Sequence, residues 1–230
     1  HEYKPSIQDV IYMSLILGHV AALAGLEIMC LVTDFANFFN QLGLAEEELP
    51  WFVSMILPMV PEHDRATFVA EYVMPFGVSC ASGIAQRFAD LICALFRIRM
   101  RESEAECAEE EPEEIQRWQQ ICRAMAKRTG NVEDDLWFIV CFTDDPMLQW
   151  VVSRGRSERV MTVWHTLLLD LKILVAKPVK WQMSPMVKWC GVYHCPMLGL
   201  VVMPVDKQLQ AVAKIKQCRL DSAVIEDLQS

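Results

Sequence analysis

The chain contains 230 residues, of which 53% are hydrophobic, and carries a formal net charge of −9. That length and apolar content exclude a disordered tail and suffice for one substantial core, or for one domain with an appendage. The chain begins with His1 and not with Met, which suggests a fragment or a processed product. Nine cysteines without a Cys-x-x-Cys pair or a secretory signal predict reduced thiols in an intracellular protein, cytoplasmic or nuclear and not secreted.

The negative charge is concentrated in one segment. Residues 102–114 hold eight acidic residues and no basic one, whereas the rest of the chain holds 22 acidic and 21 basic residues. We expect this segment to be a solvated, mobile excursion, because its like charges repel one another and it has little to bury. From Pro146 onward, eleven Lys and Arg stand against six Asp and Glu. The C-terminal part is therefore compatible with a nucleic-acid partner despite the overall charge.

The first predicted element is an apolar helix that begins after Ser6, a suitable N-cap residue. With the IMCLV that follows, it forms an apolar run from Val10 to Val32 that is about long enough for a bilayer, so a membrane anchor is one hypothesis. His19 and Glu27 lie inside the run, and no basic cluster flanks it. We favour a buried helix followed by a buried strand at 28–32, with no membrane partner.

Apolar periodicity and charged ends predict helices at 82–100, 112–130 and 157–173, and a short amphipathic helix at 203–218. We expect the helix at 157–173 to bury an apolar stripe formed by residues 160, 161, 163, 164, 167, 168 and 171. The lysines of the last helix are placed to meet phosphates. His194 lies near Cys190 and Cys195, but alternation along a strand sends these side chains to opposite faces, which favours packing over a zinc site.

Two β-rich apolar runs, 136–142 and 147–152, flank Asp144 and Asp145 and predict a β-hairpin. Asp is an ordinary turn residue, so a solvated turn is the plain interpretation. The functional interpretation is a site for a divalent ion, since paired carboxylates suit Mg²⁺, and it requires a third carboxylate. Asp34 supplies one, because the predicted buried apolar strand IMCLVT ends on it. Two strands that end side by side would bring the three together for in-line phosphoryl transfer.

Five segments resemble, in order, motifs A to E of the reverse-transcriptase palm: LVTDFANFF, MPFGVSCASGIAQRF, CFTDDPM, LKILVAKPVKWQMSP and VKWCGVYHCPMLGLVVMPVDK. They are most similar to those of retroelement enzymes of the tyrosine-recombinase (DIRS-like) group, and the resemblance extends from about Asp34 to Lys207. It implies an α/β (α+β) fold, with a mainly antiparallel palm sheet, helices packed on one face and the other face open to a duplex. Fingers and thumb would be largely absent.

The resemblance also implies a role for each matching residue. Asp34, Asp144 and Asp145 would be the catalytic carboxylates, with Asp34 and Asp144 as ligands of two Mg²⁺ or Mn²⁺ ions and Asp145 holding the geometry and charge. Phe39 would be the aromatic gate against the 2′-hydroxyl of an incoming nucleotide, with a core Phe as the alternative. Pro75, Phe76 and Gly77 would lie beside the template base, and Trp189, Cys190 and Gly191 would form the primer grip. Lys180, or alternatively Lys177, would lie near the leaving pyrophosphate; the other interpretation of either residue is an ordinary surface lysine.

The implied reaction extends a DNA primer on an RNA or DNA template with deoxynucleoside triphosphates, as one part of a polyprotein with further domains. Phe142 stands where the family has Tyr, and 110 positions separate Asp34 from Asp144, so we predict an insertion. The expected division is a helix and first palm strand (1–33), motifs A and B (34–100), an acidic insertion and helix (101–130), motifs C to E (131–207) and the start of a thumb or connection (208–230). The competing hypothesis is a non-catalytic retroelement remnant that at most binds nucleic acid.

Overall fold

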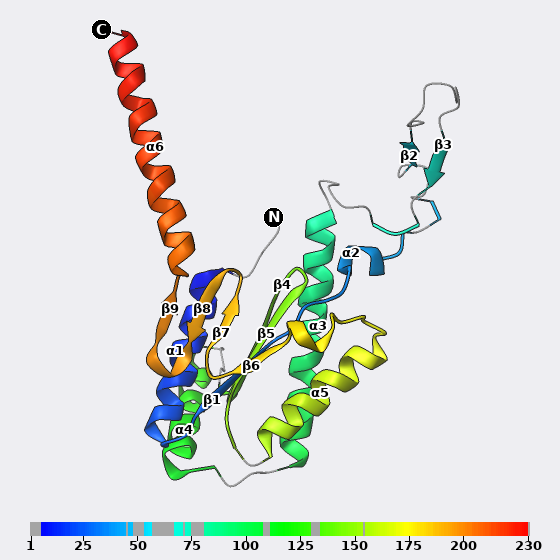
Figure 1. Ribbon diagram of the computed structural model, residues 1–230. Coiled ribbons are helices and arrows are strands. Elements are labelled where there is room, and N and C mark those ends of the chain that lie inside the picture. Colours follow the sequence, from blue (N-terminus) through cyan, green and yellow to red (C-terminus); the bar gives the residue numbers. More distant parts are fainter. Residues whose placement is uncertain are drawn as a thin grey trace.

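The computed structural model describes residues 6–44, 46–47, 53–56, 67–70, 72–74, 81–107, 111–129, 134–153 and 155–229. These residues form a mixed α and β structure in which every paired strand is antiparallel (Figure 1). The central sheet has four strands in the order β4-β5-β1-β6, a second sheet has the order β7-β8-β9, and β2 pairs with β3. The predicted α+β class with a mainly antiparallel sheet is confirmed.

The elements follow one another along the chain with these bounds: α1 Ile7–Leu23, β1 Ile28–Val32, α2 Phe38–Gln41, β2 Val53–Ile56, β3 Thr67–Ala70, α3 Ala81–Glu106, α4 Glu113–Thr129, β4 Trp137–Phe142, β5 Asp145–Val151, α5 Arg156–Asp170, the 3₁₀ turn η2 Pro178–Lys180, β6 Gln182–Ser184, β7 Val187–Trp189, β8 Val192–Cys195, the 3₁₀ turn η3 Pro196–Leu198, β9 Leu200–Val202 and α6 Val205–Gln229. The strand predicted at 28–32 and the hairpin around Asp144 are therefore present.

The N-terminal apolar run divides into a helix and a strand, as predicted. Ser6 caps α1 through a reciprocal capping box, because its hydroxyl accepts from the backbone N–H of Asp9 while the Asp9 carboxylate accepts from the N–H of Ser6. The helix ends before Gly25, which has a φ of 65°, and β1 begins at Ile28. In the part of the chain that the structure describes, no helix has the length and apolarity needed to cross a bilayer.

One face of the central sheet is covered by α3 and α5. Leu31, Ile139, Leu148 and Trp150 point from the sheet into this core, which α3 and α5 complete with Phe96 and Trp164. The rings of Phe96 and Trp164 meet edge to face with their centroids 6.0 Å apart. The predicted helices at 82–100 and 157–173 are confirmed as packing partners of this face, although Leu171 of the expected stripe is 40% exposed.

The opposite face of the sheet is also covered, so the prediction that helices pack on one face alone is wrong. Cys30, Val32, Met147 and Val151 point from β1 and β5 into a second core, shared with α1, α4 and β7. Inside it, the Ser14 hydroxyl of α1 donates to the side chain of Gln149 on β5 over 2.9 Å. Because both faces are buried, β1 and β5 are apolar almost throughout, without the alternation of a half-exposed strand.

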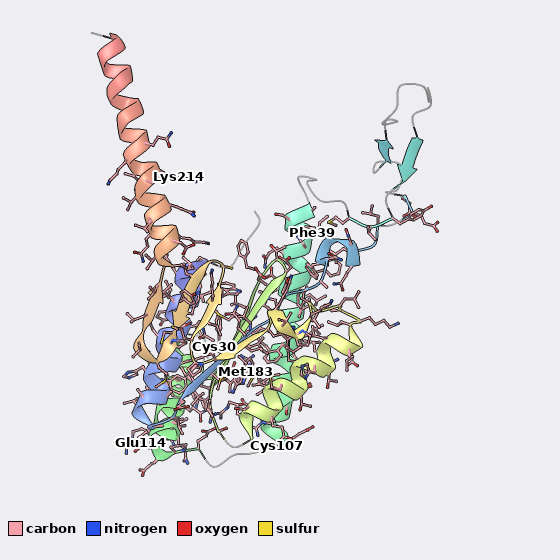
Figure 2. The ribbon with its side chains drawn as sticks, viewed as in Figure 1. Cys30, Phe39, Cys107, Glu114, Met183 and Lys214 are labelled. Atoms are coloured by element: carbon pink, nitrogen blue, oxygen red, sulfur yellow. The ribbon has the colours of Figure 1, made fainter. Side chains whose placement is uncertain are left out.

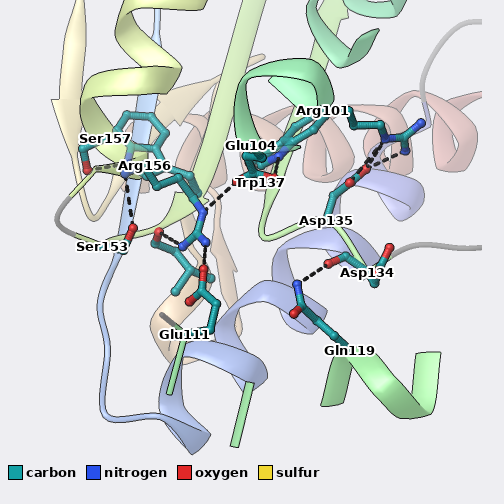
Figure 3. A network of polar contacts seen from close by, with 12 residues as sticks. Arg101, Glu104, Glu111, Gln119, Asp134, Asp135, Trp137, Ser153, Arg156 and Ser157 are labelled. Atoms are coloured by element: carbon teal, nitrogen blue, oxygen red, sulfur yellow. Dashed lines mark hydrogen bonds and ion pairs between the residues drawn. The ribbon is translucent and has the colours of Figure 1, made fainter. Parts of the chain in front are cut away.

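Most of the described residues of the acidic segment are solvent-exposed, as its composition predicts, but two of its glutamates bind a buried cation. It continues α3 as far as Glu106, and two of its glutamates, Glu104 and Glu111, accept from the guanidinium of Arg156 at the start of α5 (Figure 3). The Arg156 side chain is only 2% exposed and also donates to the carbonyl of Val151. Glu104 accepts in addition from the indole N–H of Trp137. Arg156, which lies 52 positions after Glu104 and 45 positions after Glu111, thus neutralises part of the acidic segment.

The C-terminal helix is longer than predicted and leaves the body of the molecule. α6 has 25 residues, and it extends away from the sheets, with Lys214 on its shaft (Figure 2). Among its described side chains, Val205, Leu209, Val212 and Ile215 are all exposed by about half or more. The strand pair β2 and β3 lies at the opposite side of the molecule, beyond α2 (Figure 1).

Candidate active site

Asp34 lies directly beyond the end of β1, next to the β4–β5 hairpin. β1 pairs with β5 so that Val32 faces Met147, and the chain then brings the N–H of Phe35 within 2.9 Å of the carbonyl oxygen of Asp144. On its other side, the carbonyl of Asp34 accepts from the N–H of Ala176 over 2.7 Å. The backbone of Asp34 is therefore held between the hairpin turn and the segment before η2, which brings the predicted residues of motifs A and C together.

Asp144 and Asp145 occupy the tip of the hairpin, as predicted. Phe142 pairs with Asp145, so that only Thr143 and Asp144 form the turn. Thr143 adopts a φ of 59°, which a β-branched residue rarely does. The two carboxylates are partly buried, and Asp145 is already the first residue of β5.

The carboxylates interact through their charges. Burial, followed by repulsion from Asp144 and Asp34, raises the pKa of Asp145 from 3.8 to about 6. The pKa of Asp144 is also raised, mainly by burial and then by Asp34. Both aspartates thus have higher pKa values although Lys180, the one cation acting on them, lowers each. The site therefore holds more negative charge than its own residues compensate.

Lys180 is the counter-ion of Asp34. Its Nζ atom lies 2.8 Å from Oδ2 of Asp34, and this hydrogen bond raises the pKa of the lysine. The Lys180 side chain is 64% exposed and is carried by η2, so it can leave the pair without disturbing the core. Lys177, the alternative in the sequence prediction, lies nearby but shows no such contact among the described residues.

Two hollows adjoin the Asp34–Lys180 pair. The first has a volume of about 520 Å³ and is lined by Asp34, Asp144, Lys180 and Phe39 among others. Phe39 on α2 is only 8% exposed and belongs to the core on the α3 side, and it also lines this hollow. The second hollow, of about 460 Å³, has Asp34, Asp145 and Lys180 in its wall. Hollows therefore lie on two sides of the carboxylates.

The β7–β8 hairpin closes the second hollow. Its turn is Cys190–Gly191, with φ angles of 47° and 83°, and Trp189 donates from its indole N–H to the carbonyl of Asp145 over 2.8 Å. Partial burial and then the charges of Asp145 and Asp144 raise the pKa of Cys190 to about 12, so its thiol stays protonated. A Cβ atom added at Gly191 would meet Nζ of Lys207. Trp189, Cys190 and Gly191 are thus attached directly to the carboxylate site.

One predicted group cannot be placed, and one important residue was not predicted. Pro75, Phe76 and Gly77 lie outside the described residues. Gln86 on α3 is buried and binds both the N–H of Thr143 and the carbonyl of Cys141 through its side chain. The sequence does contain a signal for it: Gln86 is the one polar member of the buried stripe that continues with Ala89, Cys93 and Phe96.

The carboxylates fit a divalent cation in their chemistry. They are hard oxygen donors with uncompensated charge, as Mg²⁺ and Mn²⁺ require, and they face open hollows. Among the described residues, no group of three or more His, Cys, Asp or Glu side chains is arranged as a metal site. The Lys180 ammonium is the cation beside Asp34.

The raised pKa of Asp145 predicts an unusual pH dependence of stability. Between pH 3.8 and about 6 the folded state binds the proton more tightly than the unfolded chain, so the unfolding free energy falls as the pH rises through this window. Asp145→Asn removes this loss. Urea unfolding of both metal-free proteins at about pH 4 and about pH 7 is expected to show the variant gaining stability relative to wild type at the higher pH. Asp144, Asp34, Lys180 and Cys190 are present in both proteins, so their titration does not distinguish them by composition. A difference in unfolding free energy between the two proteins that is the same at both pH values would contradict the prediction.

The described geometry therefore unites the sequence-predicted residues Asp34, Asp144, Asp145, Lys180 and Trp189 in one partly buried, negatively charged site. It joins the ends of two neighbouring antiparallel strands, and a separate hairpin closes one side. A functional assignment depends on this geometry and on the sequence motifs. Comparison with protein-family models and with curated proteins finds no match for the chain.

Proposed function

We propose that this chain is the palm of an RNA-directed DNA polymerase and catalyses template-directed transfer of a nucleotidyl group to a primer 3′-hydroxyl. The observation that carries the proposal is the meeting of Asp34 with Asp144 and Asp145 at the ends of adjacent antiparallel strands, where their charges repel. Burial and neighbouring carboxylates raise the pKa of Asp144 and Asp145, which destabilises their charged forms, and a cation that binds there would explain why these residues lie together.

Asp34 and Asp144 would hold two Mg²⁺ or Mn²⁺ ions, with Asp145 supporting the negative charge of the site. When bound, such ions lower the pKa of the attacking hydroxyl and stabilise the charge that develops on the phosphate. Asp145 contributes through its backbone as well, since its carbonyl anchors the indole of Trp189. The carboxylates belong to a sheet that is buried on both faces, and this rigidity suits ions whose spacing must be held constant.

The two hollows divide the substrates between them. The hollow next to Phe39 would receive the deoxynucleoside triphosphate, where the ring opposes a 2′-hydroxyl. The Lys180 side chain is exposed and lines both hollows. Once a divalent ion neutralises the Asp34 carboxylate, Lys180 would leave it and bind the phosphates of the nucleotide. The hollow closed by Trp189, Cys190 and Gly191 would receive the primer end. Recognition of the duplex would be through shape and backbone.

The second candidate, a non-catalytic remnant that binds nucleic acid, is favoured by one observation. The Lys180–Asp34 ion pair neutralises one of the three carboxylates without a metal, so a folded remnant could retain these residues without binding a metal. In that case divalent ions would not be needed for nucleic-acid binding, and no nucleotide would be incorporated. The two candidate functions therefore predict different results in a primer-extension assay.

The test is extension of a labelled DNA primer on an RNA template by the purified chain, with Mg²⁺ or Mn²⁺ and all four deoxynucleoside triphosphates. We expect extension by wild type and none by Asp34→Asn. The matched control is Asp170→Asn, which makes the same change in an exposed ion pair between the end of α5 and Arg99 of α3 and should extend as wild type does. A folded wild-type chain that binds template–primer but adds no nucleotide would overturn the proposal and support the remnant.

A further inference from the structure

The turn that carries Asp144 has a strained backbone. It is a two-residue hairpin turn whose first central residue, Thr143, has a φ of 59°. Glycine is the usual residue there, because a Cβ atom clashes in the left-handed region and β-branching makes the clash worse. Thr143 is also buried, so no solvent contact stabilises its N–H. Something else must hold this turn in place.

Gln86 supplies the missing contacts from α3. Its side chain is buried, and its Oε1 atom accepts from the N–H of Thr143 over 3.0 Å. Its Nε2 atom donates to the carbonyl of Cys141 over 2.9 Å, so one amide binds both sides of the turn. Nε2 also donates to the carboxylate of Asp90, one helical turn further along α3, at 2.9 Å. Because a carboxylate only accepts, Asp90 determines which end of the amide faces Thr143.

The held turn leads directly to the other half of the site. The residue after Thr143 is Asp144, whose carbonyl accepts from the N–H of Phe35, next to Asp34. A turn that relaxed to negative φ at Thr143 would reorient the peptide that precedes Asp144 and break this connection. α3 therefore determines, through one amide, how the hairpin tip sits against the end of β1.

We infer that Gln86 is a positioning residue that holds the Thr143–Asp144 turn in its left-handed conformation and so places Asp144 and Asp145 against Asp34. Gln86 contacts neither hollow; it acts through the backbone of the turn. Its effect on catalysis rests on the proposed function, whereas its effect on the turn does not. Asp90 is its partner and sets the orientation of the amide.

The test combines Gln86→Met, which keeps most of the side-chain volume, with Thr143→Gly, which adopts positive φ without help. For Gln86→Met we expect kcat for primer extension to fall about 10–100-fold while KM for the nucleotide changes little. In the double variant, Thr143→Gly should restore kcat at least about tenfold, because the turn no longer needs the clamp. The control is Gln149→Met, a buried glutamine on the other face of the sheet, which Thr143→Gly should not rescue.

A second measurement keeps the inference testable if wild type shows no polymerase activity. The midpoint of urea unfolding should rise on Thr143→Gly by more in the Gln86→Met background than in the wild-type or Gln149→Met background. That selective rescue supports the clamp whatever the reaction is. Equal shifts in all three backgrounds, or a loss of kcat that Thr143→Gly leaves unchanged, would overturn it and leave Gln86 as a packing residue.

Discussion

Asp144→Asn is expected to reduce primer extension by at least about 10³-fold, since it removes a charged ligand at the point where transition-state charge develops. The change is nearly isosteric, and the Asp144 contact with the N–H of Phe35 uses the backbone carbonyl, so the turn should survive. Folding should not suffer. Neutralising Asp144 removes repulsion with Asp145, so the metal-free variant should be at least as stable as wild type at pH 7.

The measurement is single-nucleotide incorporation at saturating Mg²⁺, together with urea unfolding of the same preparations. Asp170→Asn controls for loss of a carboxylate elsewhere. The combination of lost activity with kept or increased stability separates a functional carboxylate from a structural one. A variant that retains more than about a tenth of the wild-type rate would show that Asp144 is not part of the reacting site.

Arg156→Met is expected to lower the unfolding free energy by about 3–5 kcal/mol, the usual cost of removing one partner from a buried ion pair. The Arg156 guanidinium is almost fully buried and binds Glu104, Glu111 and the carbonyl of Val151, and the backbone N–H of Arg156 donates to the Ser153 hydroxyl (Figure 3). Its removal leaves two partly buried glutamates near each other. The junction of α3, β5 and α5 would lose its common partner.

Arg99→Met is the matched control for this loss. Arg99 pairs with Asp170 at 2.7 Å, but both side chains are substantially exposed, so its removal should cost at most about 1 kcal/mol. Both variants are compared by urea unfolding at constant pH, with the change read from the midpoint at an unchanged denaturant slope. Equal losses for the two variants would mean that the buried network adds nothing beyond a surface pair.

The elements with strong local signals were predictable from the sequence. The Ser6 capping box, the apolar strand at 28–32 and the hairpin around Asp144 depend on neighbours within a few residues, and each is present. The convergence of Asp34 with Asp144 followed from one further step, the pairing of two apolar strands. The choice of Lys180 over Lys177 agrees with the contact to Asp34, although its role in the reaction stays a prediction.

The errors arose where a partner lies far away in the sequence. Composition did not reveal that Glu104 and Glu111 are partnered, because the cation that binds them comes from α5. The covering of the second face by α1 was missed although the sequence carries its signal, because strands that are apolar without alternation, such as β1 and β5, are typical of a sheet buried on both faces. Gln86 was not predicted, since the turn that it binds is 57 positions away in the sequence.

Equilibrium binding of Mn²⁺, followed by the electron paramagnetic resonance signal of the free ion, tests most directly whether the three carboxylates form a divalent-cation site. Wild type, Asp144→Asn and Asp170→Asn would be titrated in the presence of template–primer with a chain-terminated end and the next nucleotide. The site described here predicts that wild type and Asp170→Asn bind Mn²⁺ alike and that Asp144→Asn binds at least about tenfold more weakly. Equal binding by all three proteins would contradict the assignment of Asp34, Asp144 and Asp145 as a metal site.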